Sequence, residues 1–343
     1  MAMTILDRKD ALEAFLSGQL HAQANLTEAR RLAGGASRET WAVAVETEDS
    51  AGLDKLALVL RMDMGGEIYD QALTRAQEFT LLQVVHQSGV LVPRPRWLCS
   101  DASLLGAPFL IMDRLEGESV GRRIVKEPAM AKARQMLPHQ LGEQLARIHN
   151  IDPFQERLHF LPRPLPEESP AQVALNLAAR HLWEIGEPHP VLEWAIRWLD
   201  LNQPKTIRLG LVHGDFRVGN IMVGPDGLRG IFDWEFAHLG DPLEDLAWPC
   251  VRSWRFGHDQ LRFGGIGDPE EFLAAYEAVR ETKVDRQLLR YWEVMGNFRW
   301  AVGCIAQAYR HLSGQTRNLE LASLGRRTCE VELDLLDLIC RSL

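Results

Sequence analysis

The sequence predicts an α+β fold of two lobes, in which a small β-rich lobe precedes a larger, mainly helical lobe. Strand-like alternation and turns rich in glycine or proline are concentrated between residues 32 and 112. Helical periodicity dominates after Gly121 and is interrupted by one hairpin pattern, at residues 211–232. A chain of 343 residues is long enough to give each lobe its own core. We therefore place the first lobe at residues 1–115 and the second at residues 116–343.

The composition is that of an ordinary globular protein, with a net charge of −9. Nucleic acids and anionic membranes both select a basic face, so we expect neither as a partner. Residues 1–16 carry acidic side chains within their apolar stretch, which predicts no signal peptide, and no window approaches the roughly 18 apolar residues of a membrane span. We therefore expect a cytoplasmic protein. The cysteines are scattered, which favours buried thiols in a reducing compartment: Cys99, Cys250, Cys304, Cys329 and Cys340.

The first lobe begins with a short amphipathic helix at residues 8–20, followed by a strand-turn-strand pattern at residues 32–46. The glycine pair Gly34-Gly35 forms its turn, which is either a plain hairpin or a loop whose backbone N–H groups contact phosphates. Residues 55–63 form the next strand. Leu56, Leu58 and Leu60 share one face of that strand, and Arg61 lies on the other face with small apolar residues.

A helix is predicted from Glu67 to Gln87. Glu78 lies beside the apolar stripe of that helix, so it either extends to water or meets a cation of a neighbouring strand. Arg61 is the candidate cation, although it is equally consistent with a solvated arginine at the sheet edge. An apolar strand at Phe109–Met112 then ends in a polar turn that contains Gly117, which is a plausible connector between the lobes.

The second lobe is predicted to consist mainly of helices. The segment from Phe154 to Pro170 carries four prolines and is predicted to be an irregular loop. The segment at residues 285–312 is hydrophobic nearly all round, which places it in the core. Residues 181–201 are predicted to hold one or two helices, and further helices are predicted at residues 136–151, 269–281, 285–312 and 319–340.

A polar cluster occupies the hairpin pattern of the second lobe, where Gly-Pro-Asp-Gly at residues 224–227 supplies the turn. Asp215, Asn220 and Asp233 follow or precede apolar strand segments. Carboxylate and amide oxygens are hard ligands of the kind that Mg²⁺ accepts together with substrate phosphates. A carboxylate that is not committed to metal can instead accept a proton from an attacking hydroxyl. The Asp-x-x-x-x-Asn spacing is that of the catalytic loop of phosphoryl-transfer enzymes.

These motifs carry a resemblance to a known family. The sequence HGDFRVGN at residues 213–220, followed by IFDWE and GDPLEDLAW, resembles the aminoglycoside phosphotransferase and choline kinase group of small-molecule kinases. That group shares the protein-kinase-like fold and carries an HGDxxxxN loop, with a DxE motif thirteen residues after the asparagine, as here. The strand that ends in LVLR is most similar to phosphotransferases associated with acyl-CoA dehydrogenases.

The resemblance implies a role for each part of the chain. Residues 1–115 would be the nucleotide-binding lobe with its hinge, and residues 116–343 the catalytic and substrate-binding lobe. Asp215 would be the catalytic residue, and Asn220 and Asp233 would hold Mg²⁺. The family usually has lysine where this chain has an arginine on the third strand. The residues implied for ATP are Gly34, Gly35 and Ser37 in the phosphate loop, Arg61 and Glu78, and the hinge backbone at Asp113 and Leu115.

Several polar residues near the motifs have simpler explanations. We expect His213 to be a structural hydrogen-bonding residue because Asp215 already supplies the base. Asp241 and Asp245 are expected to brace the loop by accepting backbone N–H bonds rather than to bind metal. Arg217 either touches the transferred phosphate or faces solvent. Glu235 either reaches metal through water or faces solvent, and Trp234 and Trp248 are expected in the core or in a cleft wall.

The sequence therefore predicts a kinase that transfers the γ-phosphate of ATP to a hydroxyl of a small molecule. Residues 251–343 hold 13 Lys and Arg and 13 Asp and Glu, so no acidic excess favours a polycationic aminoglycoside. The alternatives are an aminoglycoside O-phosphotransferase, a nucleotide-binding pseudokinase and a metal-dependent phosphohydrolase. The following residues suit a partly apolar acceptor with an anionic group, such as a hydroxyacyl thioester of coenzyme A, or are merely helix surface and core: Arg252, Arg255, Arg299, Arg310, Trp254, Trp300 and Tyr309.

Overall fold

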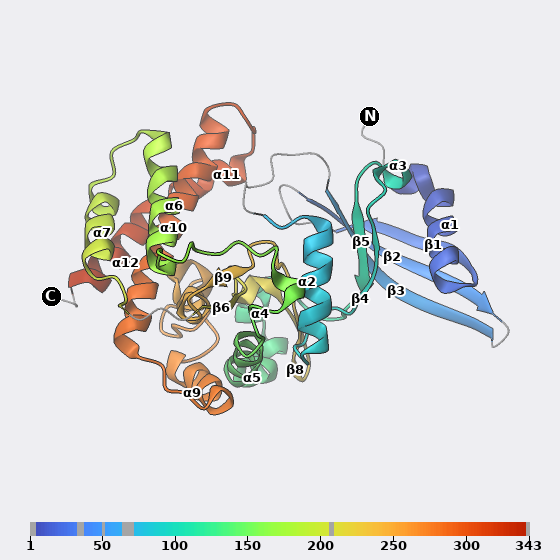
Figure 1. The fold of residues 1–343 in the computed structure, drawn as a ribbon, viewed down its shortest axis with the longest axis horizontal. Coiled ribbons are helices and arrows are strands. Elements are labelled where there is room, and N and C mark those ends of the chain that lie inside the picture. The colour runs from blue at the N-terminus through green and yellow to red at the C-terminus, as the bar shows by residue number, and fades with distance from the viewer. Residues whose placement is uncertain (1–4, 33–37, 50–51, 64–71, 206–208, 341–343) are drawn as a thin grey trace. The chain divides into compact units, whose positions relative to one another are not determined.

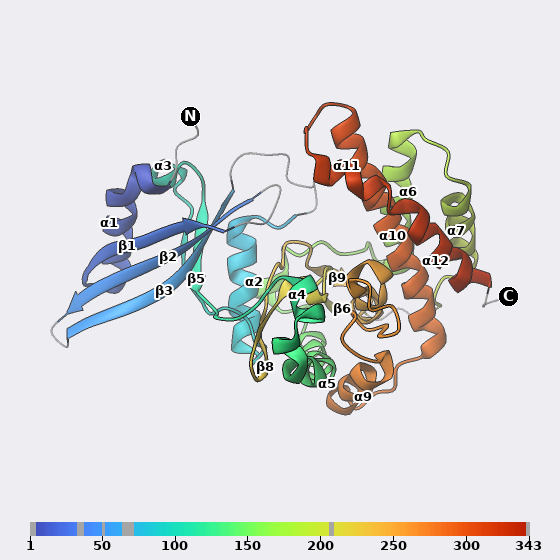
Figure 2. The ribbon, with the colours of Figure 1, turned by 180° about the vertical axis from the view of Figure 1, so that it is seen from behind.

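A computed structural model describes residues 5–32, 38–49, 52–63, 72–205 and 209–340. The chain divides into two compact units, which Figures 1 and 2 show as ribbons from two sides. The first unit comprises residues 1–117, 154–161 and 229–237, and the second comprises the rest of the chain. A five-stranded antiparallel sheet near the N-terminus and a mainly helical C-terminal part confirm the predicted α+β fold.

The first unit is built on a sheet with the strand order β1-β2-β3-β5-β4, in which all neighbouring strands are antiparallel. The three longest strands follow one another in the chain, so their pairings need only short connections. Strand β1 was not expected from the sequence, because its outward-facing positions are mostly polar. The strands are β1 (Gln23–Arg31), β2 (Arg38–Asp49), β3 (Gly52–Asp63), β4 (Pro95–Cys99) and β5 (Phe109–Asp113).

Helices cover both faces of this sheet. The first unit also contains η1 (Ile5–Arg8), α1 (Lys9–Leu20), α2 (Arg75–Gln87), α3 (Ala102–Leu105) and η3 (Glu156–Leu158).

Strand β3 shows why both faces are covered. Leu58 and Leu60 are fully buried in a cluster with Leu16 of α1, whereas Val59 points the other way and packs against a cluster that contains Phe79 of α2. Because side chains alternate along a strand, Arg61 projects on the same face as Val59, as the sequence predicted.

Helix α2 begins later than its apolar periodicity suggested. Thr74 caps it, because the Thr74 hydroxyl accepts a bond from the backbone N–H of Gln77 and the Gln77 side-chain oxygen accepts one from the backbone N–H of Thr74. This capping box fixes the start of α2 at Arg75, so the predicted helix from Glu67 is wrong at residues 72–74, and residues 67–71 lie outside the described residues. The sequence Thr-Arg-Ala-Gln at residues 74–77 carries the pattern of a capping box.

The second unit is organised around the long helix α10 (Arg286–Leu312), which contacts α6, α7, α8, α11 and α12. Trp292, Val294, Met295 and Phe298 of this helix are buried, which confirms that it lies in the core. The other helices of the unit are α4 (Gly121–Lys126), η2 (Pro128–Met130), α5 (Ala131–His149), α6 (Pro170–Ile185), α7 (Pro190–Leu201), η4 (Val218–Asn220), α8 (Leu243–Ala247), η5 (Trp248–Cys250), η6 (Arg252–Arg255), α9 (Pro269–Arg280), α11 (Leu319–Gly325) and α12 (Thr328–Cys340).

The segment predicted to hold one or two helices holds parts of two, and one segment predicted as a single helix is divided in the structure. The segment at residues 181–201 contains the end of α6 and all of α7, separated at Gly186, which adopts a left-handed conformation. The segment at residues 319–340 is likewise two helices, α11 and α12. Helices α5 and α9 pack closely at Gly142, where a Cβ atom would collide with the backbone oxygen of Phe272.

The predicted hairpin is present, and it consists of β7 (Ile221–Gly224) and β8 (Gly227–Ile231). A second small sheet pairs β6 (Gly210–Val212) with β9 (His238–Gly240). This pairing brings the start of the HGDFRVGN loop next to the strand that precedes α8. Because α8 follows β9 directly, its side chains can reach the backbone of the loop.

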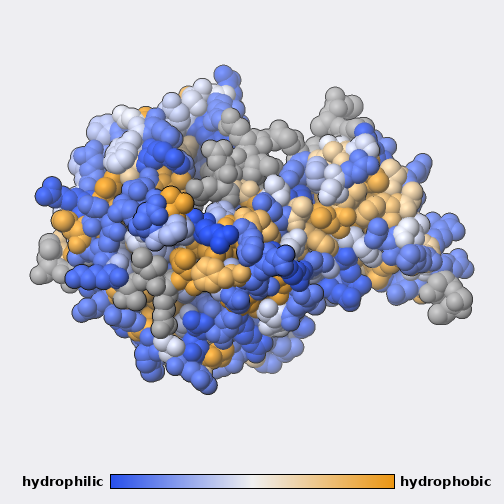
Figure 3. Space-filling model, viewed as in Figure 1, coloured by the Kyte–Doolittle hydropathy of each residue, from blue (hydrophilic) through white to orange (hydrophobic). Residues whose placement is uncertain are grey.

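All five cysteines are free, but only Cys99, Cys250 and Cys304 are buried. Cys329 and Cys340 are exposed, so the prediction of five buried thiols is wrong for these two residues on the C-terminal helix. The face of the protein in Figure 3 is mostly hydrophilic, with separate hydrophobic patches. Within the described ranges, no helix is both long and apolar enough to cross a membrane.

Candidate active site

In the first unit, the structure brings together Arg61, Glu78 and Asp233. The Nη1 atom of Arg61 donates to Oε1 of Glu78 at 2.8 Å, and its Nη2 atom donates to Oδ1 of Asp233 at 2.9 Å. Burial alone would lower the pKa of Arg61, but the charges of Glu78 and Asp233 outweigh it and hold this pKa above its usual range. A planar guanidinium can contact two carboxylates at once through separate nitrogens, which an ammonium group does less well.

Glu78 is shared between two arginines. Its side chain is fully buried, and it forms a second ion pair with Arg75. The Arg75 side chain is only 1% exposed, and its Nε atom lies 3.2 Å from Oδ1 of Asp63. A buried carboxylate requires such partners, because removing its charge from water is costly. Sequence reasoning did not identify Arg75, although a Glu three residues after an Arg on one helix is a recognisable pair. The two arginines fix the position of Glu78 and, through it, of Arg61.

Asp233 has a left-handed backbone conformation, with φ of 71°. This region is uncommon for residues other than glycine, and such strain concentrates at functional sites. The neighbouring residues hold it in place, since Ile231 and Trp234 are fully buried and the Trp234 indole donates to the Ile231 carbonyl at 3.4 Å. The conformation presents the Asp233 carboxylate to Arg61.

The predicted hinge lies at the end of β5. The N–H of Asp113 donates to the carbonyl of Arg94 at 2.9 Å, and its carboxylate accepts from Arg96 at 2.7 Å. Both the N–H and the carboxylate of Asp113 are therefore engaged within the first unit. Leu115 is half-buried and contacts Gly230, where a Cβ atom would collide with the Leu115 side chain. The predicted phosphate-loop residues Gly34, Gly35 and Ser37 lie outside the described residues.

In the second unit, Asp215 and Asn220 are in direct contact. The Nδ2 atom of Asn220 donates to Oδ2 of Asp215 at 2.6 Å and to the Asp215 carbonyl at 2.9 Å. The other carboxylate oxygen, Oδ1, accepts from Nε of Arg217 at 2.9 Å and from the indole Nε1 of Trp248 at 2.7 Å. Asp215 is thus held by three side chains, while 15% of its own side chain remains exposed.

Arg217 turns back over the loop to reach Asp215. Its guanidinium carbon lies 4.5 Å from the centre of the Trp254 ring, in a cation-π contact. It also lies against Gly219, where a Cβ atom would collide with the guanidinium. The absence of a side chain at Gly219 therefore permits the Arg217 conformation. Arg217 is therefore engaged with Asp215 and Trp254 rather than simply facing solvent, and its contact with the transferred phosphate stays a prediction.

Asp245 braces the backbone of the catalytic loop, which confirms the expectation for this residue. Its carboxylate accepts from the backbone N–H of His213 at 2.6 Å and from that of Gly214 at 3.0 Å. His213 is fully buried and its Nδ1 accepts from the Asp215 N–H at 3.2 Å, so it has the expected structural role. These bonds fix the loop on both sides of the turn at Gly214.

Asp241 differs from this expectation. Its carboxylate accepts from the backbone N–H of Leu243 and from the indole of Trp292 at 3.1 Å, so it braces the turn before α8 rather than the catalytic loop. Burial raises the pKa of Asp241 to about 6. Two hydrogen bonds from uncharged groups compensate only part of the cost of burying this charge.

A buried network extends from Asp245 to α5 and α9. Nε2 of His149 lies 3.3 Å from Asp245, and its Nδ1 lies 2.9 Å from the hydroxyl of Tyr276. Burial lowers the pKa of His149, which keeps the ring neutral. A neutral ring that donates from Nε2 to the carboxylate must accept at Nδ1 from the Tyr276 hydroxyl. The catalytic loop is therefore linked to the helical core through one ordered chain of hydrogen bonds.

The arginines considered for an anionic acceptor are mostly engaged with the protein itself. Arg252 donates to Asp259 and Asp334, and Arg255 donates to the Cys250 carbonyl. Arg299 donates to Glu244 at 3.2 Å and lies over the Trp248 ring. These contacts favour the structural reading of all three residues.

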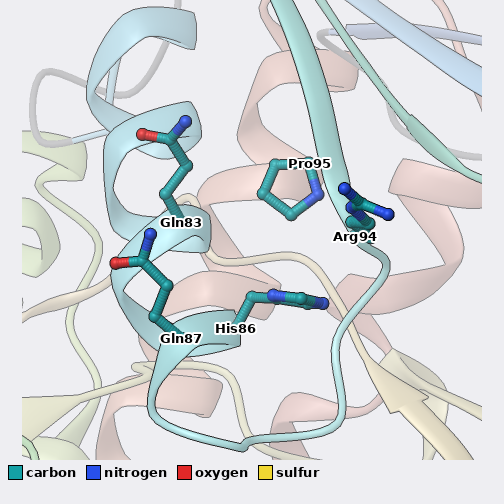
Figure 4. Close-up of a pocket in the computed structure, with 5 residues that line it drawn as sticks. All are labelled: Gln83, His86, Gln87, Arg94 and Pro95. Atoms are coloured by element: carbon teal, nitrogen blue, oxygen red, sulfur yellow. The ribbon is translucent and has the colours of Figure 1, made fainter.

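A separate pocket of about 420 Å³ lies in the first unit (Figure 4). Gln83, His86 and Gln87 line it from α2, and Arg94 and Pro95 line it from the start of β4. Arg157 donates to the side chains of both glutamines, at 2.8 and 3.0 Å. The described lining residues include none of the predicted site residues, so this pocket is distinct from the candidate active site.

Comparisons with known proteins identify the family and the fold of this chain. A model of the phosphotransferase enzyme family matches residues 28–293. Acyl-CoA dehydrogenase family member 10 of Mus musculus is 28% identical over 258 residues, which are 71% of this chain and 22% of that protein. The chain thus spans about a fifth of the length of this relative.

Solved structures share the fold at low sequence identity. A candidate aminoglycoside phosphotransferase from Ralstonia eutropha is 20% identical with a TM-score of 0.76, and the alignment covers 97% of this chain and 98% of that one. Spectinomycin phosphotransferase, solved with ADP and spectinomycin, is 16% identical with a TM-score of 0.59, and the alignment covers 94% of this chain and 97% of that one. The fold is therefore the protein-kinase-like fold of these phosphotransferases, and the predicted resemblance is confirmed. With a family match over most of its length, the chain belongs to the phosphotransferase enzyme family.

Proposed function

We propose that the protein is a small-molecule kinase that transfers the γ-phosphoryl group of ATP, with Mg²⁺, to a hydroxyl group of its acceptor. The observation that carries this proposal is the environment of Asp215. Three N–H donors orient its carboxylate, and part of it remains open to solvent. An oriented and accessible carboxylate is what a general base for a hydroxyl nucleophile requires.

Asp215 orients the acceptor hydroxyl towards the γ-phosphorus and accepts its proton as the new P–O bond forms. Phosphoryl transfer passes through a loosely bonded transition state, so positioning and charge neutralisation supply most of the rate. Asp245 contributes indirectly, because it holds the backbone of His213 and Gly214 and so fixes the position of Asp215, the next residue.

The residues proposed for metal binding have the right chemistry for Mg²⁺. Asn220 uses its amide nitrogen to hold Asp215, which leaves its amide oxygen as the ligand atom. Asp233 supplies a carboxylate, so that both donors are hard oxygens. Mg²⁺ held by Asn220 and Asp233 would neutralise charge on the nucleotide phosphates. We assign Arg61 and Glu78 to the same nucleotide, with Arg61 contacting the α- and β-phosphates.

Residues 1–115 are proposed as the nucleotide-binding lobe with its hinge, and residues 116–343 as the catalytic and substrate-binding lobe. The Asp113 carbonyl and the Leu115 N–H are assigned to the adenine base. The phosphate loop is assigned to Gly34, Gly35 and Ser37. Support for nucleotide binding comes from the spectinomycin phosphotransferase of similar fold, which was solved with ADP.

For the acceptor, we favour a hydroxyacyl-CoA-like compound or another metabolite that is not an aminoglycoside. The equal numbers of acidic and basic residues in residues 251–343 do not suit a polycation. The mouse relative that carries a similar segment is named an acyl-CoA dehydrogenase family member, which supports an acyl compound. An aminoglycoside is the second candidate, because the similar spectinomycin phosphotransferase was solved with spectinomycin.

Substitution of Asp215 tests the proposed reaction. Asp215→Asn removes the base and is expected to reduce kcat by roughly 10²- to 10⁴-fold while leaving ATP binding unchanged. The acceptor is first identified by phosphorylation screens with Mg-ATP over hydroxyacyl-CoAs, aminoglycosides, choline, homoserine and sugars. Asp226→Asn, on an exposed aspartate of the hairpin turn, is the matched control.

Three outcomes distinguish the alternatives. Full turnover in Asp215→Asn would refute the assignment of the base. ATP binding without transfer to any acceptor would favour a pseudokinase. Release of phosphate from ATP without a phosphorylated acceptor would favour a phosphohydrolase.

A further inference from the structure

Among the described residues that donate to the Asp215 carboxylate, Trp248 is the one that lies outside the HGDFRVGN loop. It directly follows α8 and begins η5, so it lies three residues after Asp245. One short helical segment therefore contributes two separate contacts to the loop. Asp245 holds the loop backbone, and Trp248 holds the side chain of Asp215.

The ring of Trp248 is itself fixed by its neighbours. It contacts the rings of Trp254, at 5.4 Å between centroids, and Trp300, at 6.5 Å. On α10, Gly296 lies close to it, where an added Cβ atom would be 3.5 Å from the indole. The Arg299 guanidinium lies 5.6 Å from the ring centre. A ring packed in this way points its N–H in one direction, which makes it a rigid donor.

The hydrogen bonds to Asp215 are unequally divided between its two oxygens. Oδ1 accepts two bonds, from Arg217 and Trp248, whereas Oδ2 accepts one, from Asn220. A carboxylate offers about two lone-pair directions on each oxygen. Oδ1 is therefore saturated, and Oδ2 keeps one direction available.

From this asymmetry we propose that Trp248 is a positioning residue that, together with Arg217, occupies Oδ1 of Asp215 and thereby assigns Oδ2 as the atom that receives the acceptor proton. This inference rests on the proposed kinase function. In the transfer step, the acceptor oxygen forms a bond to the γ-phosphorus as the bond from that phosphorus to the β,γ-bridging oxygen breaks. The bridging electron pair leaves with ADP, and the hydroxyl proton moves to Oδ2. Without the indole donor, the Asp215 carboxylate has a free lone pair on each oxygen and can rotate between them.

The test removes the indole N–H but keeps an aromatic ring. Trp248→Phe is expected to lower kcat about 10- to 100-fold, the equivalent of losing one hydrogen bond to a charged group, with the KM for ATP within about twofold of wild type. Benzothienylalanine at position 248 replaces the N–H by sulfur at nearly the same shape. This variant is expected to show the same lowered kcat with an almost unchanged KM for ATP. This second variant keeps the test decisive if the smaller phenylalanine ring disturbs packing.

Trp292→Phe is the matched control. The indole of Trp292 also donates to a buried carboxylate, that of Asp241 at 3.1 Å, but it makes no contact with Asp215. The control should lower the melting temperature and leave kcat within about twofold of wild type. A loss of kcat as large in Trp292→Phe as in Trp248→Phe would show a general packing effect and overturn the proposal.

Rates are measured with Mg-ATP and the acceptor found in the screen, on the full chain. An active wild type with unchanged kcat in both position-248 variants would overturn the role of Trp248 alone. A wild type that phosphorylates no acceptor would overturn the proposed function itself. The two failures are therefore distinguishable.

Discussion

Replacing Arg61 by lysine tests why this chain has arginine on its third strand, where related enzymes usually have lysine. The guanidinium donates through separate nitrogens to Glu78 at 2.8 Å and to Asp233 at 2.9 Å. An ammonium group is a point charge on a flexible stem and does not reproduce this fork. Arg61→Lys should therefore lose at least one of the two contacts.

The expected magnitude follows from the burial of the group. A hydrogen bond to a charged group contributes about 1.5–3 kcal/mol, and little solvent screening applies because the Arg61 side chain is only 11% exposed. With an unfolding entropy of about 2.1 cal/mol/K per residue, a loss of about 2 kcal/mol in this chain of 343 residues corresponds to a fall in melting temperature of roughly 3 °C. The melting temperature of Arg61→Met, which leaves Glu78 without this partner, should fall further.

Thermal unfolding with and without Mg-ATP measures both effects. Arg61→Lys keeps a positive charge for the phosphates and should retain stabilisation by Mg-ATP, whereas Arg61→Met should lose it. Arg180→Lys is the control, because Arg180 is 62% exposed and its pairing with Glu184 should contribute almost nothing. An Arg61→Lys protein as stable as wild type would refute the argument that the fork is required.

Two further predictions concern the carboxylates around α8. Asp245→Ala leaves two loop N–H groups and His149 without their buried acceptor, so the free energy of unfolding in urea should fall by about 3–5 kcal/mol; a change below about 1 kcal/mol would contradict its bracing role. Asp241 has a pKa raised to about 6 in the folded protein, so its contribution to stability is present below the unfolded pKa near 3.8 and is lost as the pH rises through about 6. Relative to Asp241→Asn, the wild type should therefore lose about 2 kcal/mol between about pH 4.5 and pH 7; a difference between the two proteins that does not change with pH would be the contrary result.

Local signals in the sequence predicted much of the fold. The alternation in β3 identified which side of the sheet Arg61 occupies, because side chains alternate along any strand. The turn residues at 224–227 predicted the hairpin, because glycine and proline restrict the backbone to turn conformations. The start of α2 and the division of the last helix were missed, since capping and breaks depend on single residues rather than on periodicity.

The sequence by itself determined the chemical identity of the candidate site: the Asp-x-x-x-x-Asn spacing and the second aspartate thirteen residues later. Only the tertiary structure decided which partners each acid has. Trp248 lies 33 residues from Asp215 along the chain, and Tyr276 lies 127 residues from His149. Contacts at such separations are created when helices pack, and no local pattern specifies them. The residues proposed to perform the chemistry were therefore recognisable from spacing, whereas the residues that orient them became visible only in the packed fold.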